Sequence, residues 1–140
     1  MGLFNETASW AMATERTNQQ ARILLVDDEP NILAALKFLM NQAGYDVATA
    51  NSGAAALSMV DQFQPDVVVL DVMMPGVDGF EVAKQIRENT NLLDTQIIFL
   101  TAKGTTEDRR QGFKSGGELY LTKPFDNADV VDSVAYALQF

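Results

Sequence analysis

Residues 65–79 read PDVVVLDVMMPGVDG, and this stretch decides the fold. Its four apolar residues at 67–70 include three valines, as expected for a strand that is buried on both faces. Asp71 follows the strand at once, and Pro75 and Gly76 then favour a turn. Asp71 would then lie at the carboxyl end of a strand, which is where open α/β sheets bind their ligands.

A second stretch repeats this arrangement. Residues 22–30 read RILLVDDEP, so Asp27 and Asp28 also end an apolar strand. If the two strands are parallel neighbours, these acids meet Asp71 at one edge of the sheet. At ~4 Å each carboxylate pair repels by about 1 kcal/mol in water, or ~4 kcal/mol at an effective dielectric of ~20. A bound cation relieves that repulsion, and hard oxygen ligands suit Mg²⁺. The acids therefore predict a metal-assisted phosphoryl site.

Outward from these stretches, strands and helices alternate from Arg22 onward. The predicted strands are residues 22–26, 46–50, 66–70, 96–100 and 118–121. The predicted helices are residues 31–43, 53–63, 79–89, 106–115 and 127–138, with end signals at Pro30, Gly44, Ser52, Asp78 followed by Glu81, and Asp126. Short right-handed crossovers then give an α/β, doubly wound, flavodoxin-like fold: a five-stranded parallel sheet of order 2-1-3-4-5 with helices on both faces.

Composition restricts the function classes. The 140 residues, 47% of them apolar, suit one globular domain. Ten basic and 19 acidic residues give a net charge of −9, which argues against direct nucleic-acid binding and against an anionic membrane surface. The chain has no Cys and no His, so thiolate and imidazole chemistry are excluded. Without a membrane-spanning run or a secretory signal, we expect a cytoplasmic protein.

Residues 1–21 differ in composition from the rest and form a predicted N-terminal extension before a domain at 22–140. The extension is either a leader or a short helix. The helix would line up Phe4, Ala8 and Ala11, or Leu3, Thr7 and Trp10.

Two further polar residues end apolar runs. Thr101 closes IIFLT and Lys123 follows ELYLT, which places both at the edge that carries the acids. A Lys ammonium can form an ion pair with a carboxylate or a phosphoryl oxygen, and a Thr hydroxyl can donate a hydrogen bond to a phosphoryl oxygen. Taken singly, each has a plainer interpretation as a surface or strand residue.

Arg109 and Arg110 are interpreted as a solvated helix face, with a partner contact as the alternative.

Together, Asp27, Asp28, Asp71, Thr101 and Lys123 resemble the five-residue signature of the receiver domains of two-component response regulators, the CheY-like superfamily. The runs VDDEP, DVMMPGVDGFEV and YLTKPF are similar to that family's motifs, in the same order and spacing. The resemblance covers residues 22–140.

The resemblance implies a role for each residue. Asp71 is the expected phosphoacceptor, with a phosphohistidine of a histidine kinase or histidine phosphotransfer protein as donor. The implied Mg²⁺ ligands are Asp28, Asp71 and the backbone carbonyl of Met73, with Asp27 acting through water. Thr101 and Lys123 would bind the phosphoryl oxygens, and Thr101 and Tyr120 would form the switch.

The implied function is a signalling switch rather than an enzyme. Phosphorylation would change the surface of residues 106–115, 118–121 and 127–138 and so control a downstream effector or a missing output domain. A homodimer stays open, although the last helix lacks the basic residues common in receivers that dimerise through this surface. One alternative is a Mg²⁺-dependent phosphohydrolase, which usually carries D-x-D where this chain has adjacent Asp27 and Asp28. The other is an unphosphorylated interaction module.

Overall fold

The structure is a computed structural model that describes residues 21–140, and its centre is a parallel sheet of order β2-β1-β3-β4-β5. This order confirms the one predicted from the sequence. The strands are β1 Arg22–Val26, β2 Asp46–Ala50, β3 Val67–Leu70, β4 Gln96–Thr101 and β5 Leu119–Thr122. The helices are α2 Pro30–Gln42, α3 Gly53–Phe63, α4 Gly79–Glu88, the 3-10 helix η1 Thr90–Leu92, α5 Thr106–Lys114 and α6 Asn127–Ala137.

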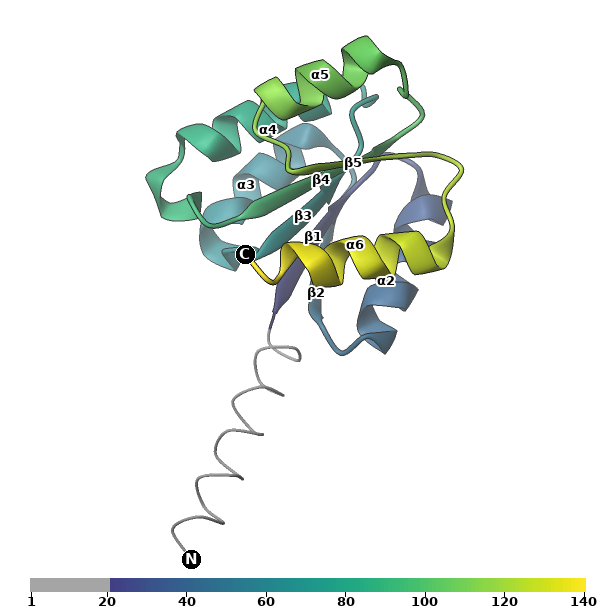
Figure 1. Cartoon of the computed structure of the whole chain (residues 1–140). Coiled ribbons are helices and arrows are strands. Elements are labelled where there is room, and N and C mark those ends of the chain that lie inside the picture. The colour runs from purple at the N-terminus through teal and green to yellow at the C-terminus, as the bar shows by residue number, and fades with distance from the viewer. Residues whose placement is uncertain (1–20) are drawn as a thin grey trace, which may run out of the picture.

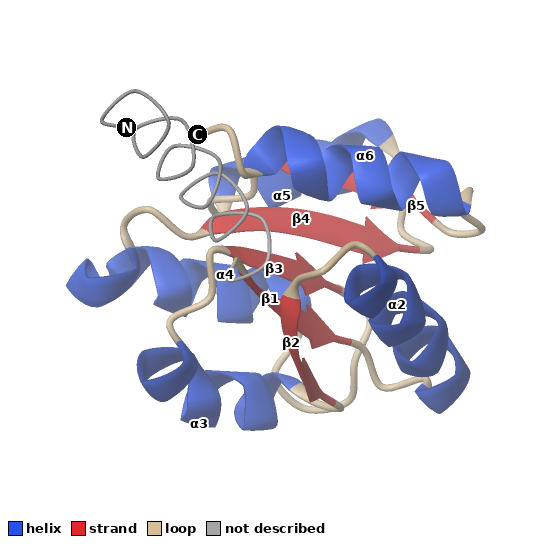
Figure 2. Cartoon of the chain, turned by 90° about the horizontal axis from the view of Figure 1, so that it is seen from below, coloured by secondary structure: helices blue, strands red, loops and turns tan. Residues whose placement is uncertain are grey.

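The helices form two layers around the sheet. Helices α2 and α6 cover one face, and α3, α4 and α5 cover the other (Figures 1 and 2). Alternate residues of each strand point to opposite faces, so Ile23 and Leu25 pack with Leu36 of α2, while Leu24 and Val26 pack on the side of α3 and α4. Because all five strands are parallel, their carboxyl ends lie at the same edge of the sheet.

The helix ends are partly as expected. Ser52 caps α3 by accepting a hydrogen bond from Ala55 N at 3.1 Å, and Asp78 caps α4 by accepting from Glu81 N at 2.9 Å. Asp126 occupies the N-cap position of α6, but its side chain makes no capping bond there, so its predicted capping role is wrong. The reciprocal capping box lies at α5 instead, between Thr105 and Asp108.

The predicted N-terminal helix falls, apart from Ala21, outside the described residues. Within residues 21–140, none of the helices has both the length and the apolar character that crossing a bilayer requires.

Candidate functional site

Strand pairing places two of the predicted acids side by side. Strands β1 and β3 are parallel, with Val26 opposite Leu70, so Asp27 and Asp71 directly follow two neighbouring strand ends. Asp71 N donates to Val26 O at 2.9 Å, which ties the two strand ends together. Asp27 is 1% exposed and Asp71 is 3% exposed. Two buried carboxylates therefore lie at the point where the strand order reverses, the usual ligand position in this architecture.

Lys123 brings a positive charge between these acids. Its Nζ lies 2.7 Å from Asp27 Oδ2 and 3.3 Å from Asp71 Oδ2. Its backbone N donates to Thr101 O at 2.9 Å, which fixes the loop after β5 against the end of β4. Burial alone would lower the pKa of Lys123, but the hydrogen bond to Asp27 and the nearby negative charges outweigh it and raise that pKa above its ordinary value. The ammonium group is therefore charged and held in the site.

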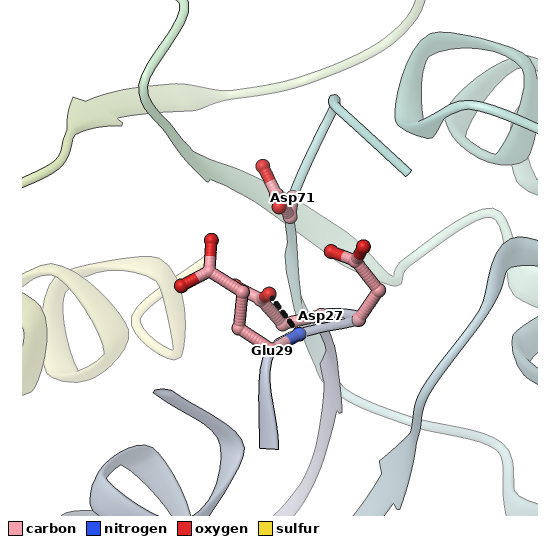
Figure 3. Close-up of side chains that lie close together, drawn as sticks. Asp27, Glu29 and Asp71 are labelled. Carbon is pink, nitrogen blue, oxygen red and sulfur yellow. Dashed lines mark hydrogen bonds between the residues drawn. The ribbon is translucent and has the colours of Figure 1, made fainter. Parts of the chain in front are cut away.

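The acidic cluster carries more negative charge than Lys123 alone can neutralise. Asp27, Asp28, Glu29 and Asp71 each offer a carboxylate oxygen, and these oxygens lie within 4.8 Å of one another. Figure 3 shows the carboxyl groups of Asp27, Glu29 and Asp71 gathered around one space. Burial raises the pKa of Asp27, even though Lys123 acts in the opposite direction. Four hard oxygen donors with this excess of negative charge fit a divalent cation such as Mg²⁺.

Glu29 is the member of the cluster that sequence reasoning missed. The available signal was its position directly after Asp27 and Asp28, at the same strand end. Its Oε1 lies 3.4 Å from Lys123 Nζ, so it is the third carboxylate in contact with the lysine.

The loop after β3 is held tightly against the start of α4. Met73 N donates to Asp71 Oδ1 at 3.3 Å, and Gly79 N donates to Val72 O at 3.0 Å. A Cβ on Gly79 would lie 2.3 Å from the carbonyl oxygen of Asp71 and 2.7 Å from Val72 Cα. Only glycine fits this approach, so the helix start fixes the backbone that carries Asp71 and Met73.

Thr101 and Tyr120 are linked through one backbone residue. Thr101 is fully buried at the end of β4, and its Oγ1 accepts a hydrogen bond from Lys103 N at 3.4 Å. The Tyr120 hydroxyl donates to the carbonyl oxygen of the same Lys103. Burial raises the pKa of Tyr120 to about 12, with a further contribution from the negative charge of Asp108. Lys103 thus connects the two residues for which the family resemblance implies a switch role.

The Tyr120 ring is enclosed on several sides. It is 6% exposed and packs against Phe99, with ring centroids 5.7 Å apart. A Cβ on Gly112 of α5 would lie 2.9 Å from the ring. The guanidinium carbon of Arg109 lies 5.4 Å from the ring centroid, within cation–π range. The interpretation of Arg109 as a solvated residue is therefore wrong, whereas Arg110 is exposed and pairs with Glu107.

A model of the response regulator receiver domain family matches residues 23–135. The chain belongs to this family. The receiver domain is 41% identical over 118 residues to "DNA-binding dual master transcriptional regulator RpaA" of Synechocystis sp., an alignment that covers 84% of this chain and 49% of that protein.

Solved structures agree with this assignment. The receiver domain matches the chemotaxis protein CheY4 of Vibrio cholerae with a TM-score of 0.81 and 31% identity, covering 84% of this chain and 98% of that one. It matches the "BeF3 Activated DrrB Receiver Domain" with a TM-score of 0.79 and 34% identity, covering 86% of this chain and 99% of that one. The receiver domain spans about half the length of the curated relatives it matches. Receiver domains are signalling domains of two-component response regulators.

Proposed function

We propose that this receiver domain is a phosphorylation-dependent switch in which Asp71 accepts a phosphoryl group from a phosphohistidine. The observation that supports this most directly is the Lys123 ammonium group, which lies within hydrogen-bonding distance of Asp27 and Asp71. A carboxylate oxygen of Asp71 attacks phosphorus, and the bond from phosphorus to the donor imidazole nitrogen breaks. That nitrogen keeps the electron pair and takes up a proton, and Asp71 becomes an acyl phosphate.

In this proposal the neighbouring residues bind and orient the reacting groups. Asp28, Asp71 and the backbone carbonyl of Met73 would hold Mg²⁺ directly, and Asp27 would hold it through water. When bound, Mg²⁺ neutralises charge on the phosphoryl oxygens. Lys123 and the hydroxyl of Thr101 would then bind the remaining phosphoryl oxygens. Asp71 needs no general base, because a carboxylate is already the nucleophilic form.

The switch would run through the backbone of Lys103. A phosphoryl group that draws the Thr101 hydroxyl towards it competes with the bond from Lys103 N to Thr101 Oγ1. Because the carbonyl of Lys103 accepts from Tyr120, a shift of this loop changes the packing of the Tyr120 ring against Arg109 and α5. The surface of α5, β5 and α6 would change with it. A few kcal/mol of differential binding is enough to move such an equilibrium.

We propose two kinds of partner for this switch. The donor is a histidine kinase or a histidine phosphotransfer protein, since the chain itself has no histidine. The recipient is an effector protein or an output domain that reads the α5–β5–α6 surface. The net charge of −9 favours a protein over a nucleic acid as the direct contact of this chain.

Phosphorylation by a small donor tests the proposal. Incubation with acetyl phosphate and Mg²⁺ should add one phosphoryl group, which intact-mass spectrometry detects. Asp71→Asn should abolish the added mass, whereas Asp94→Asn, which changes an exposed aspartate outside the site, should leave it unchanged. Undiminished labelling of Asp71→Asn would overturn the assignment of the acceptor.

A further inference from the structure

We propose that Glu29 is a positioning residue that receives the Lys123 ammonium group when a divalent cation binds beside the carboxylates of Asp27 and Asp71. This inference rests on the proposed function. In the structure, Lys123 Nζ lies 2.7 Å from Asp27, 3.3 Å from Asp71 and 3.4 Å from Glu29. The first two carboxylates are buried, whereas the Glu29 side chain is 59% exposed. Glu29 therefore provides Lys123 with a carboxylate partner at the solvent-exposed edge of the site.

The Glu29 side chain has no competing role in its own helix. Glu29 occupies the N-cap position of α2, yet its side chain makes no capping hydrogen bond. Short side chains such as Asp, Asn and Ser are preferred at that position, because they reach the first free N–H groups of the helix. Glu29 N donates instead to Asp27 Oδ1 at 2.9 Å, a bond that Figure 3 shows. The backbone of Glu29 is thus tied to the site, and its carboxylate extends towards Lys123.

The charges explain why such a residue is needed. A divalent cation and an ammonium group repel each other at close range, so Lys123 has to withdraw from Asp27 and Asp71 when the cation binds beside them. Without another partner, the partly buried ammonium group would lose its ion pairs in that step, which is costly. Glu29 gives it a replacement partner within reach. Glu29 should therefore strengthen cation binding, and it should do so through Lys123.

A double-mutant cycle measured by isothermal titration calorimetry with Mg²⁺ tests this coupling. Glu29→Ala should weaken Mg²⁺ binding by about two- to fivefold, the range that an exposed ion pair can supply. In a Lys123→Ala background, the same change should have little further effect. Glu29→Asp keeps the charge but shortens the side chain, so it should weaken binding as Glu29→Ala does. The control Glu88→Ala, an exposed position at the end of α4, should bind as the unmodified chain does.

Three results would overturn the inference. Equal weakening by Glu29→Ala with and without Lys123 would mean that Glu29 acts on the cation directly. Unchanged affinity in Glu29→Ala, with circular dichroism showing an intact fold, would leave Glu29 without a role. Full affinity in Glu29→Asp would mean that charge alone matters. Absence of Mg²⁺ binding by the unmodified chain is a different result, because it would overturn the metal site of the proposed function itself.

Discussion

The ammonium group of Lys123 lies 2.7 Å from the carboxylate of Asp27, although 96 residues separate the two in the sequence. The contact forms because the loop after β5 is held at the carboxyl edge by the bond from Lys123 N to Thr101 O. Lys123 balances part of the negative charge that the strand ends bring together. Without a bound cation, Lys123 is therefore the group that offsets the repulsion between the carboxylates of Asp27 and Asp71.

Replacing Lys123 by an apolar residue should destabilise the metal-free chain. Lys123→Met leaves Asp27 and Asp71 facing each other without a counter-charge, at a cost on the order of 3 kcal/mol. When Mg²⁺ is present at about a hundred times its Kd, its binding should raise the free energy of unfolding by ~2.7 kcal/mol. Urea unfolding with and without Mg²⁺ measures both effects. Lys37→Met, at an exposed position on α2, is the matched control, and equal stability of the two variants without metal would contradict the expectation.

A buried hydroxyl at the other end of the sheet should matter for stability alone. Thr95 is 4% exposed, and its Oγ1 donates to the carbonyl of Pro65 at 2.7 Å, joining the chain before β4 to the chain before β3. Thr95→Val keeps the shape and removes the donor, which should cost about 1–3 kcal/mol in the free energy of unfolding. Urea melts should show no such loss for Thr106→Val, an exposed threonine at the start of α5. A neutral Thr95→Val would mean that water satisfies the Pro65 carbonyl.

A methyl group on Gly112 should displace Tyr120. The added Cβ would lie 2.9 Å from the Tyr120 ring and 3.1 Å from Phe99. In an exposed helix position, Gly→Ala usually stabilises by ~1 kcal/mol, but here overpacking should reverse the sign and cost about 1–3 kcal/mol. Gln111→Ala, one residue away and exposed, is the control. Near-ultraviolet circular dichroism should report a changed aromatic environment in Gly112→Ala only, and an unchanged spectrum with full stability would show that the ring adapts in place.

The ionisation of Tyr120 gives a prediction about pH. Its pKa is raised from 10.0 to about 12, so the folded chain favours the neutral phenol. The resulting stabilisation is fully present below pH 10 and is lost as the pH rises through about 12. Absorbance at 295 nm (a wavelength at which tyrosinate absorbs) should show a component that titrates near pH 12. Tyr120→Phe should remove that component and Tyr136→Phe should retain it; its persistence in Tyr120→Phe would assign it elsewhere.

The sheet and most of the site were predictable because both depend on strand ends. An apolar run such as residues 67–70 has to lie inside the sheet, and the first polar residue after it has to emerge at the edge. That reasoning places Asp27, Asp71 and Lys123 correctly, because parallel strands deliver their carboxyl ends to one side. It needs no knowledge of side-chain conformation.

The remaining features depend on which way a side chain turns. Glu29 follows the acids in sequence, but only its conformation decides whether it caps α2 or meets Lys123. Arg109 could have pointed to solvent, and it lies over Tyr120 instead. Strand β5 begins at Leu119, one residue later than predicted. The side-chain carboxylate of Glu118 accepts the hydrogen bond from Ile97 N, which in a continued strand would go to a backbone carbonyl of the neighbouring strand.

The close approach of Gly79 to Asp71 has a consequence for how this chain can vary. A substitution at Asp28 or Glu29 changes a carboxylate but leaves the main chain in place. A substitution at Gly79 would push the main chain that carries Asp71, and the whole carboxyl edge of β3 would move with it. In a library of random variants selected for folding alone, the tightest restriction near this site should therefore fall on a residue that has no side chain and takes no part in the chemistry.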